Sequence, residues 1–238
     1  MRLKAVLFDL DGTLLPMDQE SFIKKYFNEI SSYLYEHGGY NPEQFMKSMW
    51  LGIKAMITND GTKTNEGAFW SVFSQIYGED KVKADMPLFE RFYEEKFKNT
   101  KSECSYTEHS RKIIDYLKNQ NIITVLATNP VFPSVATETR MGWVGLKPAD
   151  FKLITTYDNI GYCKPNPRYY LDIAKNIGVE PQDCLMVGND VSDDMTAALV
   201  GMKVFLLTDC LINSKNEDIS LYPHGDFSVL FEHVKKHI

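Results

Sequence analysis

The stretch VLFDLDGTLL, residues 6–15, constrains this chain more than any other, because it places two aspartates where a hydrophobic run ends. Asp9 and Asp11 lie two residues apart, directly before Gly12 and Thr13. Two carboxylates so close repel each other and resist removal from water, so a nearby positive charge has to offset them. The continuous apolar run before them is typical of a strand buried on both faces of a parallel sheet.

Five short apolar runs predict the strands of one sheet, at residues 3–8, 122–127, 151–155, 184–187 and 204–207. Helical patterns accompany the later strands, at residues 108–120, 167–177, 193–200 and 227–237. Residues 208–225 are predicted to form a long polar loop. Because strands alternate with helices, the expected fold class is α/β, with a doubly wound, Rossmann-like parallel sheet.

The interval from residue 16 to residue 106 interrupts this alternation and is predicted to be an inserted helical bundle. Its helices are expected at residues 19–37, 42–57, 65–77 and 87–97, with loops at GGYN (38–41), TNDGTKTNEG (58–67) and GED (78–80). The predicted domains are therefore a core, 1–15 and 107–238, and a helical cap, 16–106. The aromatic residues of the insertion are expected to form mostly its own core, with one or two at the lower rim touching substrate: Phe22, Tyr26, Phe27, Trp50, Phe69, Trp70, Phe73, Phe92 and Phe97.

Composition narrows the possible partners. The net charge of −6 over 238 residues argues against a broad nucleic-acid surface, which leaves a basic footprint, but a local site can still bind a small anion. The four cysteines form no CxxC pair and none lies beside a histidine at metal-ligand spacing, a pattern that suits a reducing cytoplasm. The N-terminal apolar stretch is too short for a signal peptide, and no stretch is long enough to span a membrane. We therefore expect a cytoplasmic protein.

Polar residues follow the predicted strands where ligands bind in an α/β sheet, beyond the carboxyl ends. The first strand is followed by Asp9, Asp11 and Thr13, the second by Thr128 and Asn129, the third by Lys164, and the fourth by Asn189, Asp190, Asp193 and Asp194. Each residue alone could be a turn former, a helix cap or a surface lysine. Their joint occurrence at successive strand ends predicts a single site.

This set of side chains suits phosphoryl transfer. Asp9 can act as the nucleophile and form an aspartyl-phosphate. Asp11, which faces the same way if the chain stays extended, can protonate the leaving oxygen and then deprotonate the attacking water. Lys164 and the Thr128 hydroxyl can bind oxygens of the transferring group. The hard oxygen donors favour Mg²⁺ as the ion that offsets the carboxylates.

The same residues resemble a known family. DLDGT (9–13), ATN (127–129), CKP (163–165) and GNDVSDD (188–194) are similar, in order, to the four motifs of the haloacid dehalogenase superfamily. The resemblance implies that Asp9 is the nucleophile and Asp11 the general acid/base, and that Thr128 and Lys164 bind phosphate. It implies Mg²⁺ held by Asp9, the backbone carbonyl of Asp11 and an acid of the fourth motif. An insertion directly after the first motif resembles the superfamily's helical cap of the first type.

The fourth motif departs from the pattern, because Asn189 stands where the family often has an aspartate. The spacing of Asp190 and Asp194 is one that the family uses. We therefore predict Asp190 as a direct metal ligand and Asp194 as a direct or water-mediated one, with Asn189 as the alternative ligand. Asp193 is predicted to be an acid at the N-terminus of the following helix.

The predicted function is that of a Mg²⁺-dependent phosphatase acting on a small phosphorylated metabolite, with Thr128, Asn129 and Lys164 in contact with the substrate. The alternatives are a phosphomutase or a haloacid dehalogenase-type hydrolase, and a non-enzymatic module that signals through a phosphorylated aspartate. A dehalogenase needs neither Asp11 nor the metal site. The metabolite is expected to be selected by the cap, at residues 17–22, 50–54 and 58–67, with Lys54 and Lys63 as candidates.

Overall fold

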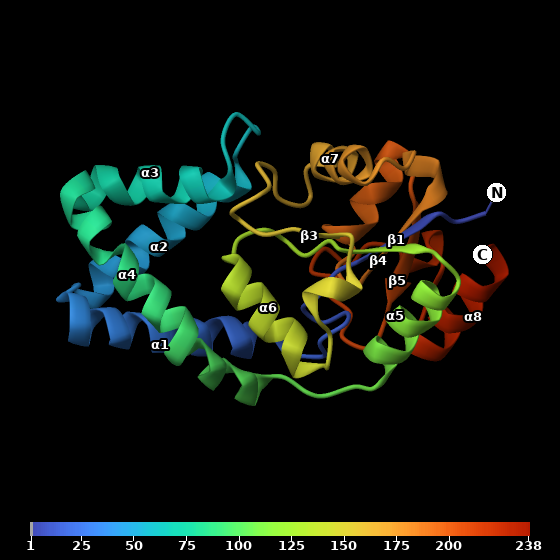
Figure 1. Cartoon of the computed structure of the whole chain (residues 1–238), viewed down its shortest axis with the longest axis horizontal. Coiled ribbons are helices and arrows are strands. Elements are labelled where there is room, and N and C mark those ends of the chain that lie inside the picture. The colour runs from blue at the N-terminus through green and yellow to red at the C-terminus, as the bar shows by residue number, and fades with distance from the viewer. Residues whose placement is uncertain (1) are drawn as a thin grey trace.

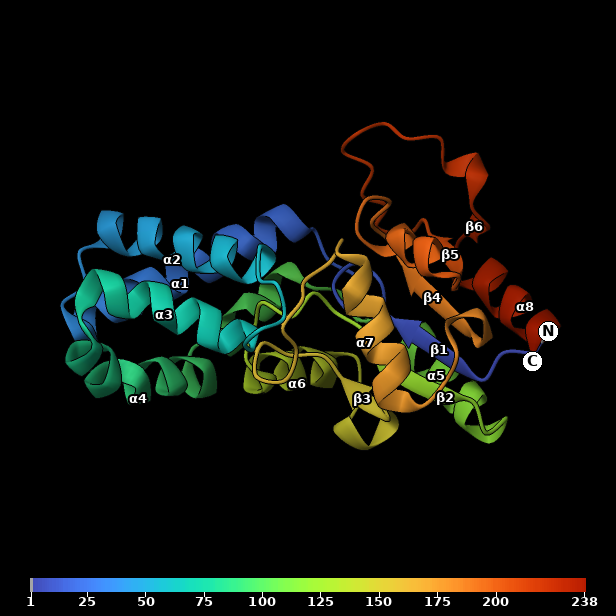
Figure 2. The ribbon, with the colours of Figure 1, turned by 90° about the horizontal axis from the view of Figure 1, so that it is seen from above.

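The computed structural model describes residues 2–238 and contains a six-stranded sheet in the order β3-β2-β1-β4-β5-β6, in which all paired strands are parallel (Figures 1 and 2). The strands are β1 (Ala5–Phe8), β2 (Ile123–Leu126), β3 (Leu153–Ile154), β4 (Cys184–Gly188), β5 (Lys203–Leu207) and β6 (His224–Gly225). The five predicted runs overlap, in order, with β1, β2, β3, β4 and β5.

Helices cover both faces of the sheet because successive side chains of each strand point to opposite sides. In β1, Val6 and Phe8 pack in a cluster with α5 (His109–Asn119) and α8 (Phe227–His237). Ala5 and Leu7 pack in a second cluster with α7 (Pro167–Ile177) and η4 (Asp194–Val200), a 3₁₀ helix. Figure 2 shows these helices on either side of the strands. The predicted α/β, doubly wound fold class is thereby confirmed.

The insertion extends to one side of the sheet as a helical bundle (Figure 1). It consists of α1 (Gln19–Gly38), α2 (Pro42–Ile57), α3 (Asn65–Tyr77), α4 (Glu79–Glu95) and the 3₁₀ helix η1 (Phe97–Glu103), together termed the cap. The chain leaves and re-enters the core at one place, where the Ser105 amide donates to the Pro16 carbonyl at 2.8 Å and Met17 pairs with Cys104. The domain boundaries at 16 and 106 stay a prediction.

Helix ends with recognisable caps lie where the sequence predicts them. The side chains of Asn41, Thr64, Asn166 and Asp226 each accept a hydrogen bond from the first turn of α2, α3, α7 and α8, respectively. Each satisfies a backbone N–H that has no partner inside the helix. Gly178 ends α7 in the left-handed conformation. The bounds of these four helices agree with the prediction.

The fourth cap helix differs from the prediction. It begins at Glu79, eight residues before the predicted start. Of the predicted loop GED (78–80), only Gly78 therefore lies outside the helix. Pro87 lies inside the helix, although we expected it in the first turn. Glu79 and Asp80 occupy that turn, where acidic side chains interact favourably with the helix dipole.

Four further differences from the prediction concern the core. The predicted third strand is reduced to β3, an edge strand that pairs only with Val125 and Leu126 of β2. The predicted helix at 193–200 is a 3₁₀ helix that begins at Asp194. Neither β6 nor α6 (Ser134–Trp143) is predicted, and α6 buries a face that includes an arginine, Arg140.

Within residues 2–238, no helix combines the length and apolar character needed to cross a membrane.

Candidate active site

The segments after β1, β2 and β4 meet at one edge of the sheet because these three strands are neighbours. A crevice of about 60 Å³ lies there. It is lined by the predicted residues Asp9, Asp11, Thr128, Asn129, Lys164, Asp190 and Asp194, and also by Gln19, Asn189, Asp193 and Ile212. The structure thus brings the seven predicted catalytic, phosphate-binding and metal-binding residues into one place, whereas Thr13 does not line the crevice.

Lys164 lies between two carboxylates of this crevice. Its Nζ donates to Asp9 Oδ1 at 2.8 Å and to Asp194 Oδ1 at 2.6 Å, and its side chain is 2% exposed. Burial alone would lower the pKa of Lys164, but Asp194 and Asp9 outweigh it and raise that pKa well above its usual value. Burial raises the pKa of Asp9 to about 7, against the opposing effect of Lys164. One lysine therefore does not fully offset the acids around it.

Asp9 and Asp11 reach the crevice by a route different from the expected extended chain. The strand ends at Phe8, and the chain then turns, with the Gly12 amide donating to the Leu15 carbonyl at 2.8 Å. Asp11 thus lies in a turn, yet its side chain lines the same crevice as that of Asp9. The side chains of Asp9 and Asp11 face the same crevice, as expected, but a turn and not an extended chain brings them there.

Asp11 forms an ion pair with Arg140, a residue that sequence reasoning missed. Arg140 Nη1 donates to Asp11 Oδ2, and the arginine side chain is fully buried. Its guanidinium lies 4.3 Å from the ring centroid of Phe132, which favours a cation at that face. Asp11 Oδ1 is buried and has no hydrogen-bond partner among residues 2–238. The signal in the sequence that could have found Arg140 is an arginine within the weakly apolar segment that forms α6.

The three aspartates of the fourth motif make different hydrogen bonds. Asp190 Oδ1 accepts from the amides of Ser192 and Asp193, and Asp194 Oδ2 accepts from the Asp190 amide at 3.0 Å. Asp193 stands at the start of η4, as predicted, but it makes no capping bond there. Its carboxylate lines the crevice and accepts from Asn129 Nδ2 at 3.3 Å, and burial raises its pKa to about 6.

Asn189 uses both ends of its amide within the protein. Its Oδ1 accepts from the Thr13 hydroxyl at 2.9 Å, and its Nδ2 donates to the Cys210 carbonyl at 2.7 Å. The side chain thereby links the turn after β1 to the segment after β5. This link gives Asn189 a structural role, and the choice of Asp190 over Asn189 as the metal ligand stays a prediction.

Gly12 gives rise to a stability prediction, because its φ is +81° and an added Cβ would lie 2.4 Å from Asn189 Nδ2. Gly12→Ala should therefore destabilise the protein by about 2 kcal/mol or more, from backbone strain and this contact together. The matched control is Gly145→Ala, where φ is +73° and nothing lies within 4 Å of the added atom. Thermal unfolding should show the larger drop in Tm for Gly12→Ala, and equal drops would contradict the contact with Asn189.

The cap contributes one of its predicted elements to this region. Gln19, at the start of α1, lines the crevice, and Met17, Asp18 and Gln19 line a more open cleft of about 600 Å³ beside it. Lys54 and Lys63 do not line the crevice. Their role in selecting a substrate stays a prediction.

The donor atoms of the crevice fit a hard divalent cation. Five carboxylates line it against one lysine, and every candidate ligand is an oxygen. Within residues 2–238, no three acidic, histidine or cysteine side chains are grouped closely enough to hold a metal by themselves. The side chains of Asp9, Asp190 and Asp194 are therefore not assembled into such a group, and the predicted ligand set, which adds the backbone carbonyl of Asp11, stays a prediction.

The sequence of the chain is similar to those of known hydrolases. Residues 3–201 match the haloacid dehalogenase-like hydrolase family. The chain belongs to this family. Pyrophosphatase PpaX of Bacillus velezensis is 26% identical over 202 residues, 85% of this chain and 82% of PpaX. Phosphoglycolate phosphatase 1 of Pseudomonas aeruginosa is 25% identical over 213 residues, 86% of this chain and 69% of that enzyme.

Solved structures of haloacid dehalogenase-like proteins share the fold. A phosphatase of the family from Thermococcus onnurineus superposes with a TM-score of 0.59 at 20% identity, over 98% of this chain and 97% of that one. The predicted superfamily is confirmed, and the chain is an enzyme, a hydrolase of this family. Its named relatives support the predicted class, a phosphoric monoester hydrolase.

Proposed function

We propose that this haloacid dehalogenase-like hydrolase is a Mg²⁺-dependent phosphatase that cleaves a small phosphorylated metabolite through an aspartyl-phosphate on Asp9. The observation that carries the proposal is the contact of Lys164 with both Asp9 and Asp194 at the bottom of the crevice. It places a buried cation beside a buried carboxylate at a strand end. A phosphoryl group there would meet a nucleophile and a positive charge together.

The chain's own residues then divide the chemistry. Asp9 Oδ1 accepts from Lys164, so we assign the attack on phosphorus to the other oxygen, Oδ2. Thr128 holds its position through its carbonyl, which accepts from Thr155 and Tyr169, and its hydroxyl makes no hydrogen bond within the described residues. That hydroxyl is therefore available to donate to a phosphoryl oxygen. Asn129 accepts from the Lys164 amide at 3.2 Å and holds the two phosphate-binding segments together.

Proton transfer is assigned to Asp11. Arg140 holds Asp11 Oδ2, which leaves Oδ1 to carry the proton to the leaving oxygen. The same carboxylate then takes a proton from the water that releases phosphate from Asp9. Arg140 acts as a positioning residue in this scheme, because it reaches the reaction through Asp11.

The proposed ligands of Mg²⁺ are Asp9, the backbone carbonyl of Asp11, Asp190 and Asp194. When bound, the ion supplies positive charge that neutralises the carboxylates and orients the phosphoryl oxygens. We also propose that the protein works in the cytoplasm on a small molecule. Its four cysteines are all free thiols, which supports a reducing compartment.

The proposed function is tested by hydrolysis of an aryl phosphate with Mg²⁺ and with a chelator, followed by kcat/KM for a panel of phosphorylated metabolites. We expect turnover that requires the metal, and a large preference within the panel set by the cap. Turnover that ignores the chelator would contradict the metal. Isomerised sugar phosphate in place of released phosphate would favour the mutase.

Mg²⁺ should stabilise the protein more at high pH than at low pH. Burial raises the pKa of Asp9 to about 7 and that of Asp193 to about 6, so both carboxyls are largely protonated at about pH 5 and ionised at about pH 8. An acid whose pKa is raised in the folded state stabilises the fold below its unfolded pKa of about 4, and that stability is lost as the pH rises to about 7. The metal requires its proposed ligand Asp9 in the ionised form, and an ionised Asp193 in the same crevice adds further attraction for the cation.

We therefore expect Mg²⁺ at about 100 times its Kd to raise Tm by about 5–10 °C at about pH 8 and by clearly less at about pH 5. The measurement is a thermal unfolding series with Mg²⁺ against KCl of matched ionic strength. An equal rise in Tm with KCl would show that the effect is general screening and would contradict a specific site.

A further inference from the structure

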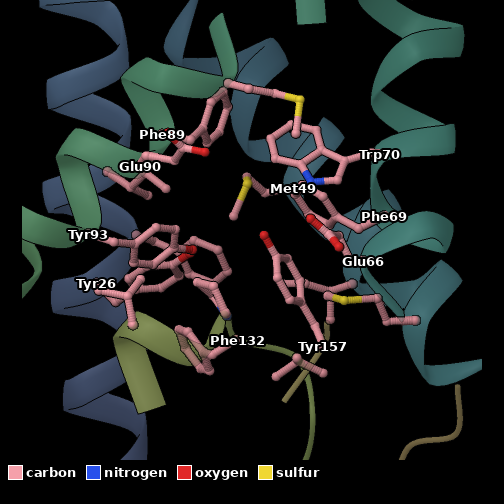
Figure 3. A pocket seen from close by; sticks show the side chains of 18 of the residues that line it. Tyr26, Met49, Glu66, Phe69, Trp70, Phe89, Glu90, Tyr93, Phe132 and Tyr157 are labelled. Atoms are coloured by element: carbon pink, nitrogen blue, oxygen red, sulfur yellow. The ribbon is translucent and has the colours of Figure 1, made fainter. Parts of the chain in front are cut away.

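A second and larger cavity lies within the cap, where the cap meets the core. Its volume is about 350 Å³, which is in the range of small-molecule sites. It is enclosed by α1, α2, α3 and α4, by the segment Val131–Pro133 after β2 and by Tyr157 (Figure 3). It shares no lining residue with the crevice of Asp9 and Lys164. It is therefore a separate compartment, lined by residues that the proposed chemistry does not use.

The walls of this cavity are mostly aromatic. The aromatic rings labelled in Figure 3 are those of Tyr26, Phe69, Trp70, Phe89, Tyr93, Phe132 and Tyr157. Sequence reasoning assigned the aromatic residues of the insertion mainly to its own core. Phe22, Phe73, Phe92 and Phe97 are buried in this way, but several others face the cavity. An aromatic face attracts a cation through its quadrupole.

The charged residues of the lining are all acidic. Glu66, Glu90 and Glu94 line the cavity, and no lysine, arginine or histidine does so. In the part of the chain that the structure describes, residues 2–238, none of the three forms an ion pair. Burial and the nearby Asp158 raise the pKa of Glu66, as expected for a carboxylate that lacks a compensating cation.

Two further polar groups lie beside Glu66. Figure 3 shows the Trp70 indole nitrogen and the Tyr157 hydroxyl on the same side of the cavity as the Glu66 carboxylate. The Trp70 nitrogen is buried and makes no hydrogen bond of good geometry among residues 2–238, although the Tyr157 hydroxyl is near enough to interact with it. A ligand that carries an acceptor atom could offer this donor a better-aligned hydrogen bond.

We propose that this cavity binds an organic cation, an amine or quaternary ammonium with apolar substituents, held by the aromatic walls and by Glu66. An anionic ligand would meet three carboxylates and no basic side chain, and a purely apolar one would leave the Glu66 carboxylate without a partner. A methylated or alkylated ammonium suits both the acidic charge and the apolar walls of the cavity. Its positive charge can interact with Glu66 and with the aromatic rings, and its carbon groups can fill the volume.

Binding can be followed through the protein's own fluorescence. Of the three tryptophans, Trp50 and Trp70 line the cavity and Trp143 does not, so Trp143→Phe removes the background signal. In that background, benzyltrimethylammonium should quench or shift the emission in a saturable way. The anion phenylacetate and the neutral benzyl alcohol should bind at least about tenfold more weakly. Calorimetry on the unsubstituted protein provides the same comparison without a label.

The carboxylate is tested by Glu66→Gln, which keeps the size of the side chain and removes its charge. It should weaken the binding of benzyltrimethylammonium about tenfold and change that of benzyl alcohol little. The matched control is Glu95→Gln, an exposed residue of α4 outside the lining, which changes the net charge equally. Equal affinity for the cation and the alcohol, or no effect of Glu66→Gln beyond that of Glu95→Gln, would overturn the proposal.

This inference does not rest on the phosphatase chemistry, because the binding assays need no turnover. The Asp9→Asn variant should bind the cation as the unsubstituted protein does, so a failure of either proposal is recognised separately. In a phosphatase assay, competitive inhibition by benzyltrimethylammonium would assign the cation to the leaving group of the substrate. A change in kcat without competition would assign it to a separate effector. Absence of saturable binding overturns the proposal in either case.

Discussion

Asp9→Asn is expected to abolish phosphatase turnover, with a loss of at least about 10⁴-fold in kcat, while the protein remains folded. The substitution keeps the shape of the side chain but removes the nucleophilic carboxylate. Lys164 retains its other partner, Asp194. Because burial raises the pKa of Asp9 to about 7, ionised Asp9 opposes folding at about pH 8 in the absence of metal. The Tm of the variant there should equal or exceed that of the unsubstituted protein.

The readouts for Asp9→Asn are turnover, Tm and acid-quenched phosphoenzyme. Radiolabelled phosphate should be trapped on the peptide that contains Asp9 in the unsubstituted protein, and not in the variant. Asp80→Asn, at an exposed position of α4, is the control for loss of one negative charge. Turnover that persists in Asp9→Asn at more than about a hundredth of the original rate would rule out Asp9 as the nucleophile.

Lys164→Met is expected to produce the largest loss of stability. Removing the ammonium leaves Asp9 and Asp194 buried without the cation that both contact, which costs about 3–5 kcal/mol. For a chain of this size, the loss corresponds to a drop in Tm of roughly 10 °C. Turnover should be lost as well, since the positive charge proposed to meet the phosphoryl group is gone.

A double variant separates this effect from a general loss of charge. Adding Asp194→Asn to Lys164→Met should recover part of the Tm, because one of the two unpaired carboxylates is removed. It should recover no turnover. Lys175→Met, at an exposed position of α7, should leave Tm nearly unchanged. If Lys164→Met unfolds at the same temperature as Lys175→Met, Lys164 does not stabilise the buried acids.

The core elements were predictable because local signals and the overall pattern agree. Continuous apolar runs predicted β1, β2, β4 and β5, and the helical spacing of apolar residues, with Gly178 as a stop, predicted the bounds of α7. The crevice was predictable for the same reason. Each of its predicted residues directly follows a strand or belongs to a short motif, and parallel strands bring their carboxyl ends to the same edge.

The missed features depend on contacts that no local pattern contains. Arg140 is 129 positions from Asp11, and a charged residue in a helix is normally exposed, so its burial follows only from the pairing. Pro87 normally marks a helix start, but here the chain continues through it, with Leu88, Phe89 and Phe92 buried in the cap. Asp193 makes no capping bond and instead accepts from Asn129, which follows a different strand, so its place in the crevice depends on a contact distant in sequence.

The way the cap joins the core limits how caps can be exchanged between members of the family. The ends of the insertion are adjacent, since Ser105 donates to Pro16, so a graft could in principle be joined there through short linkers. The ring of Phe132, however, lies 5.1 Å from that of Tyr26 and 6.0 Å from that of Phe97. Phe132 belongs to the core segment before α6, and the guanidinium that holds Asp11 rests on it. A transplanted cap would therefore need aromatic residues that pack against Phe132, or Phe132 would have to be exchanged together with the cap. The unit that can be exchanged thus includes a core residue that is not adjacent to the cap in the sequence.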